Sequence, residues 1–247
     1  MSHRPGDAVP GVQRLDRILS PEPAAAPRGA GAGLTVGVLA LQGDFREHRL
    51  TLERLGAGTR EIRRPHELDG IDGLVLPGGE STTIHKLMEI YGLSGPIRAF
   101  GRSGRPVYGT CAGLITVARE TVEGYPPTLG LMDIVARRNA FGRQVASFET
   151  DLPVPAVGER PVRAVFIRAP WIESAGPGVE VLASHEGHAV AAREANVLVT
   201  AFHPELTGDT RLHELFVTMM RRGATGSAAA EPPRAGARRQ PAPAGTR

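Results

Sequence analysis

Three apolar runs, each followed by a loop and a segment with helical spacing, constrain the fold of this chain more than any other feature. The runs are short and rich in Val and Leu, as buried strands are, and the segments after them carry apolar residues three or four positions apart. We predict strand–helix units over residues 35–41 and 44–55, 73–76 and 81–90, and 107–109 and 114–118. Strands that alternate with helices in this way indicate a parallel sheet.

The second half of the chain has a different pattern. Short apolar runs separated by turn residues predict five further strands, over residues 129–136, 162–167, 179–183, 188–192 and 197–202. A last amphipathic helix over residues 209–222 has its apolar face formed by Leu212, Leu215, Phe216 and Met219. The predicted fold class is therefore α/β: a single domain with a central, mostly parallel sheet flanked by helices, plus a β-rich extension.

Both ends of the chain differ in composition from the middle. Residues 1–33 and 224–247 are low-complexity segments of Ala, Pro, Gly and Arg, with too little apolar surface to offset the entropy lost on ordering. We therefore predict a disordered N-terminal extension over 1–33, a folded domain over 34–223 and a disordered C-terminal tail over 224–247.

Charge and composition argue against several function classes. The net charge is +3, but the two end segments hold eight of the 29 basic residues and four of the 26 acidic ones, which leaves 21 against 22 in the predicted domain. A near-neutral domain argues against nucleic-acid binding. No segment approaches the roughly 18 apolar residues of a membrane span, and the N-terminal segment lacks the apolar run of a signal peptide. A single cysteine excludes an internal disulfide framework, so we predict a cytoplasmic protein.

That cysteine, Cys111, lies between the apolar run 107–109 and the helix 114–118, with Gly109 and Gly113 on either side. A lone cysteine among small residues is commonly a buried packing residue. The Gly-x-Cys-x-Gly pattern, however, has the form of a nucleophile elbow, a tight strand-to-helix turn that presents a reactive side chain. The N-terminus of the following helix would favour thiolate over thiol. Cys111 is therefore a candidate nucleophile.

A cysteine nucleophile needs a base, and among the eight histidines His203 is the best candidate. It follows the apolar run 197–202 and precedes Glu205 by two residues, a spacing that puts both side chains on one side of an extended chain. His203 could take the thiol proton while Glu205 fixes the imidazole tautomer. Alone, His-Pro-Glu is a weak signal and is often a capping turn, so its weight depends on Cys111.

Gly78 and Gly79 come just before the helix that is predicted to start at Ser81, where free backbone N–H groups converge. The segment lacks the Gly-Lys-Ser/Thr of a nucleotide-binding loop, so an oxyanion hole or a carboxylate-binding edge fits better than a phosphate site. A simple turn capped by Ser81 is the alternative.

A second cluster of polar residues contains His185, Glu186 and His188. Its spacing differs from the i, i+4 histidines of a zinc-binding helix. Gly187 lies between two apolar runs, so we predict a polar hairpin turn here and no metal site.

On an α/β chain, Cys111, His203 and Glu205 together resemble the Cys-His-Glu triad of class I glutamine amidotransferases. Within that class the chain resembles the glutaminase subunits of pyridoxal 5'-phosphate synthase, in six motifs that occur in the same order. The motifs are VLALQG (38–43), LPGGESTT (76–83), GTCAGL (109–114), RNAFGRQ (138–144), FIRAP (166–170) and FHPELT (202–207).

The resemblance implies a flavodoxin-like core and hydrolysis of L-glutamine to L-glutamate and ammonia through a Cys111 thioester, with His203 and Glu205 completing the triad. It implies an oxyanion hole made by Gly78, Gly79 and Ala112. Composition alone would make the arginines solvated surface charges, but the motif match implies a glutamine site lined by Gly79, Glu80, Ser81, Arg138, Ile167 and Arg168.

The resemblance also implies a partner and no cofactor. The ammonia would pass to a synthase subunit that makes pyridoxal 5'-phosphate from a pentose phosphate and glyceraldehyde 3-phosphate, in an assembly of twelve copies of each subunit. Two alternatives stay open. An amidotransferase of histidine biosynthesis would keep the chemistry, although the RNAFGRQ segment argues against it. A non-hydrolytic stress protein of the DJ-1 type also has a cysteine at an elbow, but it needs no His-Glu pair after its last strand.

Overall fold

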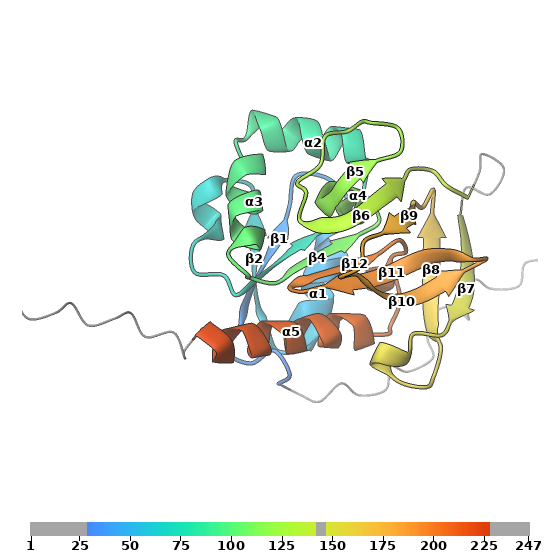
Figure 1. The fold of residues 1–247 in the computed structure, drawn as a ribbon. Helices are drawn as coiled ribbons and strands as arrows, with labels where there is room; N and C mark the ends of the chain where they lie inside the picture. The colour runs from blue at the N-terminus through green and yellow to red at the C-terminus, as the bar shows by residue number, and fades with distance from the viewer. Residues whose placement is uncertain (1–28, 142–146, 228–247) are drawn as a thin grey trace, which may run out of the picture.

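The computed structural model describes residues 29–141 and 147–227, and its centre is one ten-stranded sheet (Figure 1). The strand order is β2-β1-β3-β4-β12-β11-β9-β6-β5, with β10 paired to β11. The first five strands in this order pair in parallel, which confirms the predicted core. They are β2 (Gly58–Ile62), β1 (Thr35–Leu39), β3 (Gly73–Leu76), β4 (Val107–Thr110) and β12 (Val197–Thr200).

The three central strands β3, β4 and β12 are buried at every position. This burial on both faces explains why they occur in the sequence as unbroken apolar runs rather than as alternating patterns. The carboxyl ends of these strands lie at one edge of the sheet, and it is there that α/β proteins place their functional loops.

Beyond β12 the sheet becomes mainly antiparallel, which confirms the predicted β-rich extension. The strands of this part are β11 (His188–Glu194), β10 (Glu180–His185), β9 (Trp171–Ala175), β6 (Met132–Arg137) and β5 (Ala118–Thr121). A separate antiparallel pair is formed by β7 (Ser147–Leu152) and β8 (Val162–Ile167). The predicted hairpin turn between β10 and β11 is present, with positive φ angles of 49° at Glu186 and 81° at Gly187.

Helices lie on both sides of the parallel strands (Figure 1). On one side α1 (Phe45–Arg54) and α5 (Arg211–Ser227) pack together, and their buried histidines, His48 and His213, have ring centroids 5.2 Å apart. The other side carries α2 (Ser81–Ile90), α3 (Ser94–Arg102) and α4 (Ala112–Val117). The helix predicted over 114–118 thus begins two residues earlier, directly after Cys111, and ends where β5 starts.

Two glycines let α4 lie directly on the strands. A Cβ atom on Gly113 would lie 1.9 Å from the backbone oxygen of Leu76 in β3, and one on Gly109 would lie 2.6 Å from the backbone of Gly113. Any side chain at either position would push the helix away from the sheet. The glycines on either side of Cys111 therefore fix where the elbow lies relative to the strand ends.

Ordered structure extends beyond both expected domain boundaries. Residues 29–33 form turns in which the Gly31 N–H donates to the Leu55 oxygen at 2.8 Å, and Arg221 Nε donates to the Ala30 oxygen at 2.7 Å. α5 continues to Ser227, past the expected end at 223. The composition of the end segments could not indicate these contacts with the domain. The remaining parts of the expected disordered ends, 1–28 and 228–247, fall outside the described residues.

Across the described ranges 29–141 and 147–227, no helix has both the length and the apolar character needed to cross a bilayer.

Candidate active site

Cys111 lies at the elbow between β4 and α4, with a backbone conformation that L-residues rarely adopt: φ is 47° and ψ is −100°. Its N–H donates to the Thr200 oxygen of the neighbouring strand at 2.8 Å, which holds the strained turn in place. Two other non-glycine residues with positive φ, Asn139 and Arg168, line the same cavity as Cys111. Backbone strain of this kind concentrates at functional sites because the surrounding structure must hold it.

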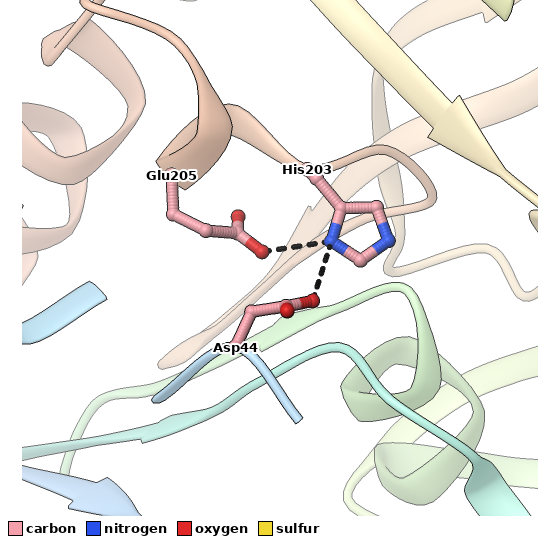
Figure 2. Close-up of side chains that lie close together, drawn as sticks. All are labelled: Asp44, His203 and Glu205. Atoms are coloured by element: carbon pink, nitrogen blue, oxygen red, sulfur yellow. Dashed lines mark hydrogen bonds and ion pairs between the residues drawn. The ribbon is translucent and has the colours of Figure 1, made fainter. Parts of the chain in front are cut away.

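His203 directly follows β12 and its loop, and its N–H donates to the Val165 oxygen of β8 at 2.8 Å. The side chain of His203 meets two carboxylates (Figure 2): its Nδ1 atom lies 2.8 Å from Glu205 Oε1 and 3.3 Å from Asp44 Oδ2. Glu205 is fully buried, whereas Asp44 is partly exposed. The predicted pairing of His203 with Glu205 is present. Both carboxylate contacts are made by Nδ1, so they do not engage the second imidazole nitrogen, Nε2.

The electrostatics of this cluster favour an ion pair. Burial of the His203 imidazole lowers its pKa, but hydrogen bonds to Asp44, Cys111 and Glu205 outweigh burial and raise the pKa to about 12. Burial raises the pKa of Glu205, yet the interactions with His48 and His203 hold it well below its usual range. The cluster therefore favours a His203 imidazolium paired with an ionised Glu205 carboxylate beside Cys111.

A cavity of about 290 Å³ lies in front of these groups. Nine of the eleven residues predicted for the site line it: Gly79, Glu80, Ser81, Cys111, Ala112, Arg138, Ile167, Arg168 and His203. The other two lie behind them. Glu205 contacts the far side of His203, and Gly78 is packed against the imidazole ring. These eleven residues come from five separate segments of the sequence that converge on one small cavity, which suits a ligand of amino-acid size.

Backbone N–H groups are available at the loop after β3 and at the start of α4. The Glu80 N–H donates to Gln42 Oε1 at 2.7 Å, and the Gly78 oxygen accepts from the Asp44 N–H at 3.2 Å. These two bonds fix the loop to the segment after β1. Gly79 has a φ of 153°, and Ala112 is the first residue of α4, where N–H groups lack intrahelical partners. This arrangement can offer donors to an oxyanion formed beside Cys111.

Arg138 and Arg168 occupy different environments at the cavity. The Arg138 guanidinium donates to the Tyr125 oxygen at 3.3 Å and lies 3.5 Å from Glu80 Oε1, so it is held in place. Glu80 in turn caps α2, accepting from the Thr83 N–H at 2.8 Å. Burial raises the pKa of the Glu80 carboxyl, but hydrogen bonds from Thr82 and Thr83 lower it overall. Arg168 is exposed at the rim.

Five residues beyond the eleven predicted site residues also line the cavity: Gln42, Asp44, Ile115, Asn139 and Pro170. Gln42 lies in the first of the six motifs, and Asn139 lies next to Arg138 in the fourth. Asp44 carried a usable signal, because it follows the loop after the first apolar run, at the same sheet edge as Cys111. Gly142, Arg143 and Gln144 of the fourth motif lie outside the described residues.

The ligand-type atoms of Asp44, His203 and Glu205 all lie within 4.8 Å of one another, close enough to surround a cation. The imidazole Nδ1, however, is the atom that faces both carboxylates, and it serves them as a hydrogen-bond donor. A nitrogen that donates a proton cannot also ligate a metal. We therefore interpret the cluster as a hydrogen-bonded charge network.

Comparison with known proteins agrees with this geometry. The model of the SNO glutamine amidotransferase family matches residues 38–222. Pyridoxal 5'-phosphate synthase subunit PdxT of Streptomyces avermitilis is 56% identical over 192 residues, which cover 77% of this chain and 96% of that protein. The subunit of the same name from Frankia alni is 55% identical and covers 79% of this chain and 99% of the relative.

Solved structures extend the comparison to the fold. A crystal structure of a glutamine amidotransferase matches with a TM-score of 0.72 and 48% identity, covering 75% of this chain and 98% of that one. PurLQS from Thermotoga maritima shares only the fold, with a TM-score of 0.54 and 15% identity. The family match spans nearly the whole described domain, including Cys111, His203 and Glu205, and the chain belongs to the SNO glutamine amidotransferase family.

Proposed function

We propose that this protein is the glutaminase subunit of a pyridoxal 5'-phosphate synthase, which hydrolyses L-glutamine to L-glutamate and ammonia. The observation that carries the proposal is that the Cys111 elbow and the His203–Glu205 pair meet at one small cavity. The relatives that are more than half identical carry the name of this subunit. That identity favours this function over an amidotransferase of histidine biosynthesis and over a non-hydrolytic stress protein.

Cys111, His203 and Glu205 are the proposed catalytic triad. The Cys111 thiolate attacks the side-chain amide carbon of glutamine and forms a tetrahedral oxyanion. The His203 imidazolium gives its proton to the leaving nitrogen, so that ammonia departs and a thioester remains. The neutral imidazole then takes a proton from water, which attacks the thioester and releases glutamate. The Cys111 thiolate and the His203 imidazolium are thereby restored, while Glu205 stays ionised.

Backbone groups and two arginines complete the proposed site. N–H groups from Gly78 or Gly79 and from Ala112 stabilise the oxyanion. The glutamine is held by Gly79, Glu80, Ser81, Arg138, Ile167 and Arg168. Arg138 is supported as the partner of the substrate carboxylate because its guanidinium is already fixed beside the cavity by Tyr125 and Glu80.

The ammonia goes to a partner synthase subunit that combines it with a pentose phosphate and glyceraldehyde 3-phosphate. We propose that residues 34–223 form the glutaminase domain, that it needs no cofactor, and that it works in the cytoplasm, where a reducing environment preserves the thiol. A complex with twelve copies of each subunit is part of the same proposal. We also expect weak activity of the isolated chain, because docking of the partner would order the oxyanion loop.

One assay tests the function. The chain is mixed with the synthase subunit, glutamine, a pentose phosphate and glyceraldehyde 3-phosphate, and both glutamate and pyridoxal 5'-phosphate are measured. We expect both products, and Cys111→Ala should abolish glutamate formation while synthesis from added ammonium continues. Thr121→Val is a matched control, because this buried hydroxyl lies outside the cavity and has no hydrogen-bond partner among the described residues. Absence of both products beside an active synthase, or retained glutamine turnover in Cys111→Ala, would contradict the proposal.

A further inference from the structure

Glu205 has a second histidine on the side that faces away from the cavity. His48, from the middle of α1, places its Nε2 atom 3.3 Å from Glu205 Oε2, and both side chains are completely buried. The other oxygen, Oε1, faces Nδ1 of His203 at 2.8 Å. The carboxylate thus bridges two imidazoles, one that reaches the cavity and one that does not.

A carboxylate without access to water needs hydrogen-bond donors at both oxygens, because an uncompensated buried charge is very costly. Among the described residues Glu205 Oε2 has no hydrogen-bond partner, and His48 Nε2 lies 3.3 Å from it. Thr110 Oγ1 lies 3.0 Å from the same Nε2 atom, so the Thr110 hydroxyl and the Glu205 carboxylate both lie beside this nitrogen. A proton of His48 on Nε2 would lie between its hydrogen-bond partner, the Thr110 hydroxyl, and Glu205 Oε2.

A third imidazole sets this tautomer. His48 Nδ1 lies 2.9 Å from Nε2 of His213 in α5, and both rings are fully buried. Nδ1 of His213 has no partner among the described residues. If His213 carries its proton on Nε2, it donates to His48 Nδ1. The atom left unpaired is then His213 Nδ1, an acceptor without a proton. The opposite assignment would leave a buried N–H unpaired, which native structures rarely tolerate.

We propose that His48 is a positioning residue for the glutaminase reaction: its Nε2–H holds the Glu205 carboxylate so that Oε1 faces His203, and His213 fixes the His48 tautomer. The inference rests on the proposed function of Cys111, His203 and Glu205. It extends their chain of polar contacts through the interior to His213 of α5, which lies about 100 residues after Cys111 in the sequence.

Removing the His48 donor should change how Glu205 titrates. The groups that face this part of the interior are Glu205, His213, Tyr108 of β4 and, beyond Glu205, His203 with Asp44. Tyr108 stays neutral, because burial raises the pKa of its hydroxyl far above its usual range. His203 and His48 are the two groups that oppose the effect of burial on Glu205. Without His48, Glu205 should take up a proton at a higher pH.

The test uses glutamate formation in the complex with the synthase subunit, measured over a range of pH. For His48→Leu we expect kcat to fall about 10–100-fold, as is typical when a group that orients a reacting side chain is lost, with KM nearly unchanged. The acidic limb of the pH profile should move to higher pH. His48→Gln should recover most of the loss, because its amide N–H can reach Glu205. His48→Asn should not, because its amide is too short to reach that oxygen.

Leu52→Ala is the matched control, since Leu52 is fully buried in the same helix and its side chain has no polar atom. It should lower stability without moving the acidic limb. An unchanged kcat and pH profile in His48→Leu would overturn the proposal, as would equal activity of the Gln and Asn variants, which differ little in polarity. Failure of the proposed function would appear differently, as absence of glutamate formation by the unmodified protein.

Discussion

Gly78 lies directly against the imidazole of His203: a Cβ atom at residue 78 would lie 2.3 Å from Cε1 and 2.8 Å from Nδ1 of the ring. It would also lie 3.3 Å from Asp44 Oδ2. Because Cβ atoms do not approach other heavy atoms so closely, any side chain at residue 78 must displace the ring or the loop. The absence of a side chain at Gly78 is therefore a condition for the position of His203.

We expect Gly78→Ala to lower kcat for glutamine hydrolysis about 100-fold or more, because displacing a reacting group by about an ångström has effects of this size. Synthesis from added ammonium should be unchanged. Gly95→Ala is the control, since a Cβ there would meet nothing within 4 Å. Steady-state kinetics of both variants in the complex check the prediction, and wild-type turnover in Gly78→Ala would contradict it.

The parallel core was predictable because its strands are buried on both faces and its helices begin after glycine-rich loops. The misses have physical causes. α3 begins Ser94-Gly95-Pro96, and glycine and proline suggest a turn, although the first turn of a helix tolerates proline because its N–H would be unpaired there. β2 is an edge strand whose side chains are mostly polar, so it lacks the apolar run that marks the others.

Contacts of the site could be predicted where the two residues are close in the sequence, and could not where they are far apart. His203 and Glu205 are two residues apart, so their pairing could be inferred from extended geometry. His48, Leu52 and Leu55 are three or four residues apart and so share one face of the helix predicted over 44–55, and all three are buried. The partners of His48, Glu205 and His213, come from segments more than 150 residues later, and only the packing of α1 against α5 determines that contact.

Arg138 and its neighbour Arg137 provide a second test. Arg137 is an exposed side chain of β6 that pairs with Glu173, with Nε–Oε2 at 2.7 Å, whereas Arg138 lines the cavity. We expect Arg138→Ala to raise KM for glutamine about 10–100-fold, the worth of one hydrogen bond to a charged group. Arg137→Ala should change KM by less than about twofold, as exposed ion pairs contribute little. A similar KM in both variants would argue against a role of Arg138 in holding the substrate carboxylate.

Asp44 should control the alkaline limit of activity. Burial lowers the pKa of His203, and the hydrogen bond to Asp44 is the largest of the effects that raise it to about 12. Asp44→Asn should therefore lower the pKa of His203, and the imidazolium should be lost at a lower pH. We expect the alkaline limb of kcat/KM to shift to lower pH, while Asp69→Asn, at an exposed position, leaves it in place. A limb that stays in place in Asp44→Asn would show that Asp44 does not act on His203.

His213 should make the fold sensitive to acid. Burial is the main cause that lowers its pKa to about 3, against about 6.5 in the unfolded chain. Between these values the unfolded state binds more protons, so this residue's contribution to stability is complete above about pH 6.5 and is lost as the pH falls.

The comparison with His213→Leu isolates this contribution. The raised pKa of His203 makes a contribution of opposite sign, which is lost as pH rises, and the lowered pKa of Glu205 adds acid sensitivity at lower pH. Both contributions are present in the unmodified protein and in His213→Leu, so the comparison removes them. In urea unfolding between pH 7.5 and 4, the free energy of unfolding should fall more steeply in the unmodified protein, by up to about 1.4 kcal/mol per pH unit. Parallel curves for the two proteins would mean that His213 is not buried in its neutral form, and the tautomer chain through His48 to Glu205 would lose its terminal donor.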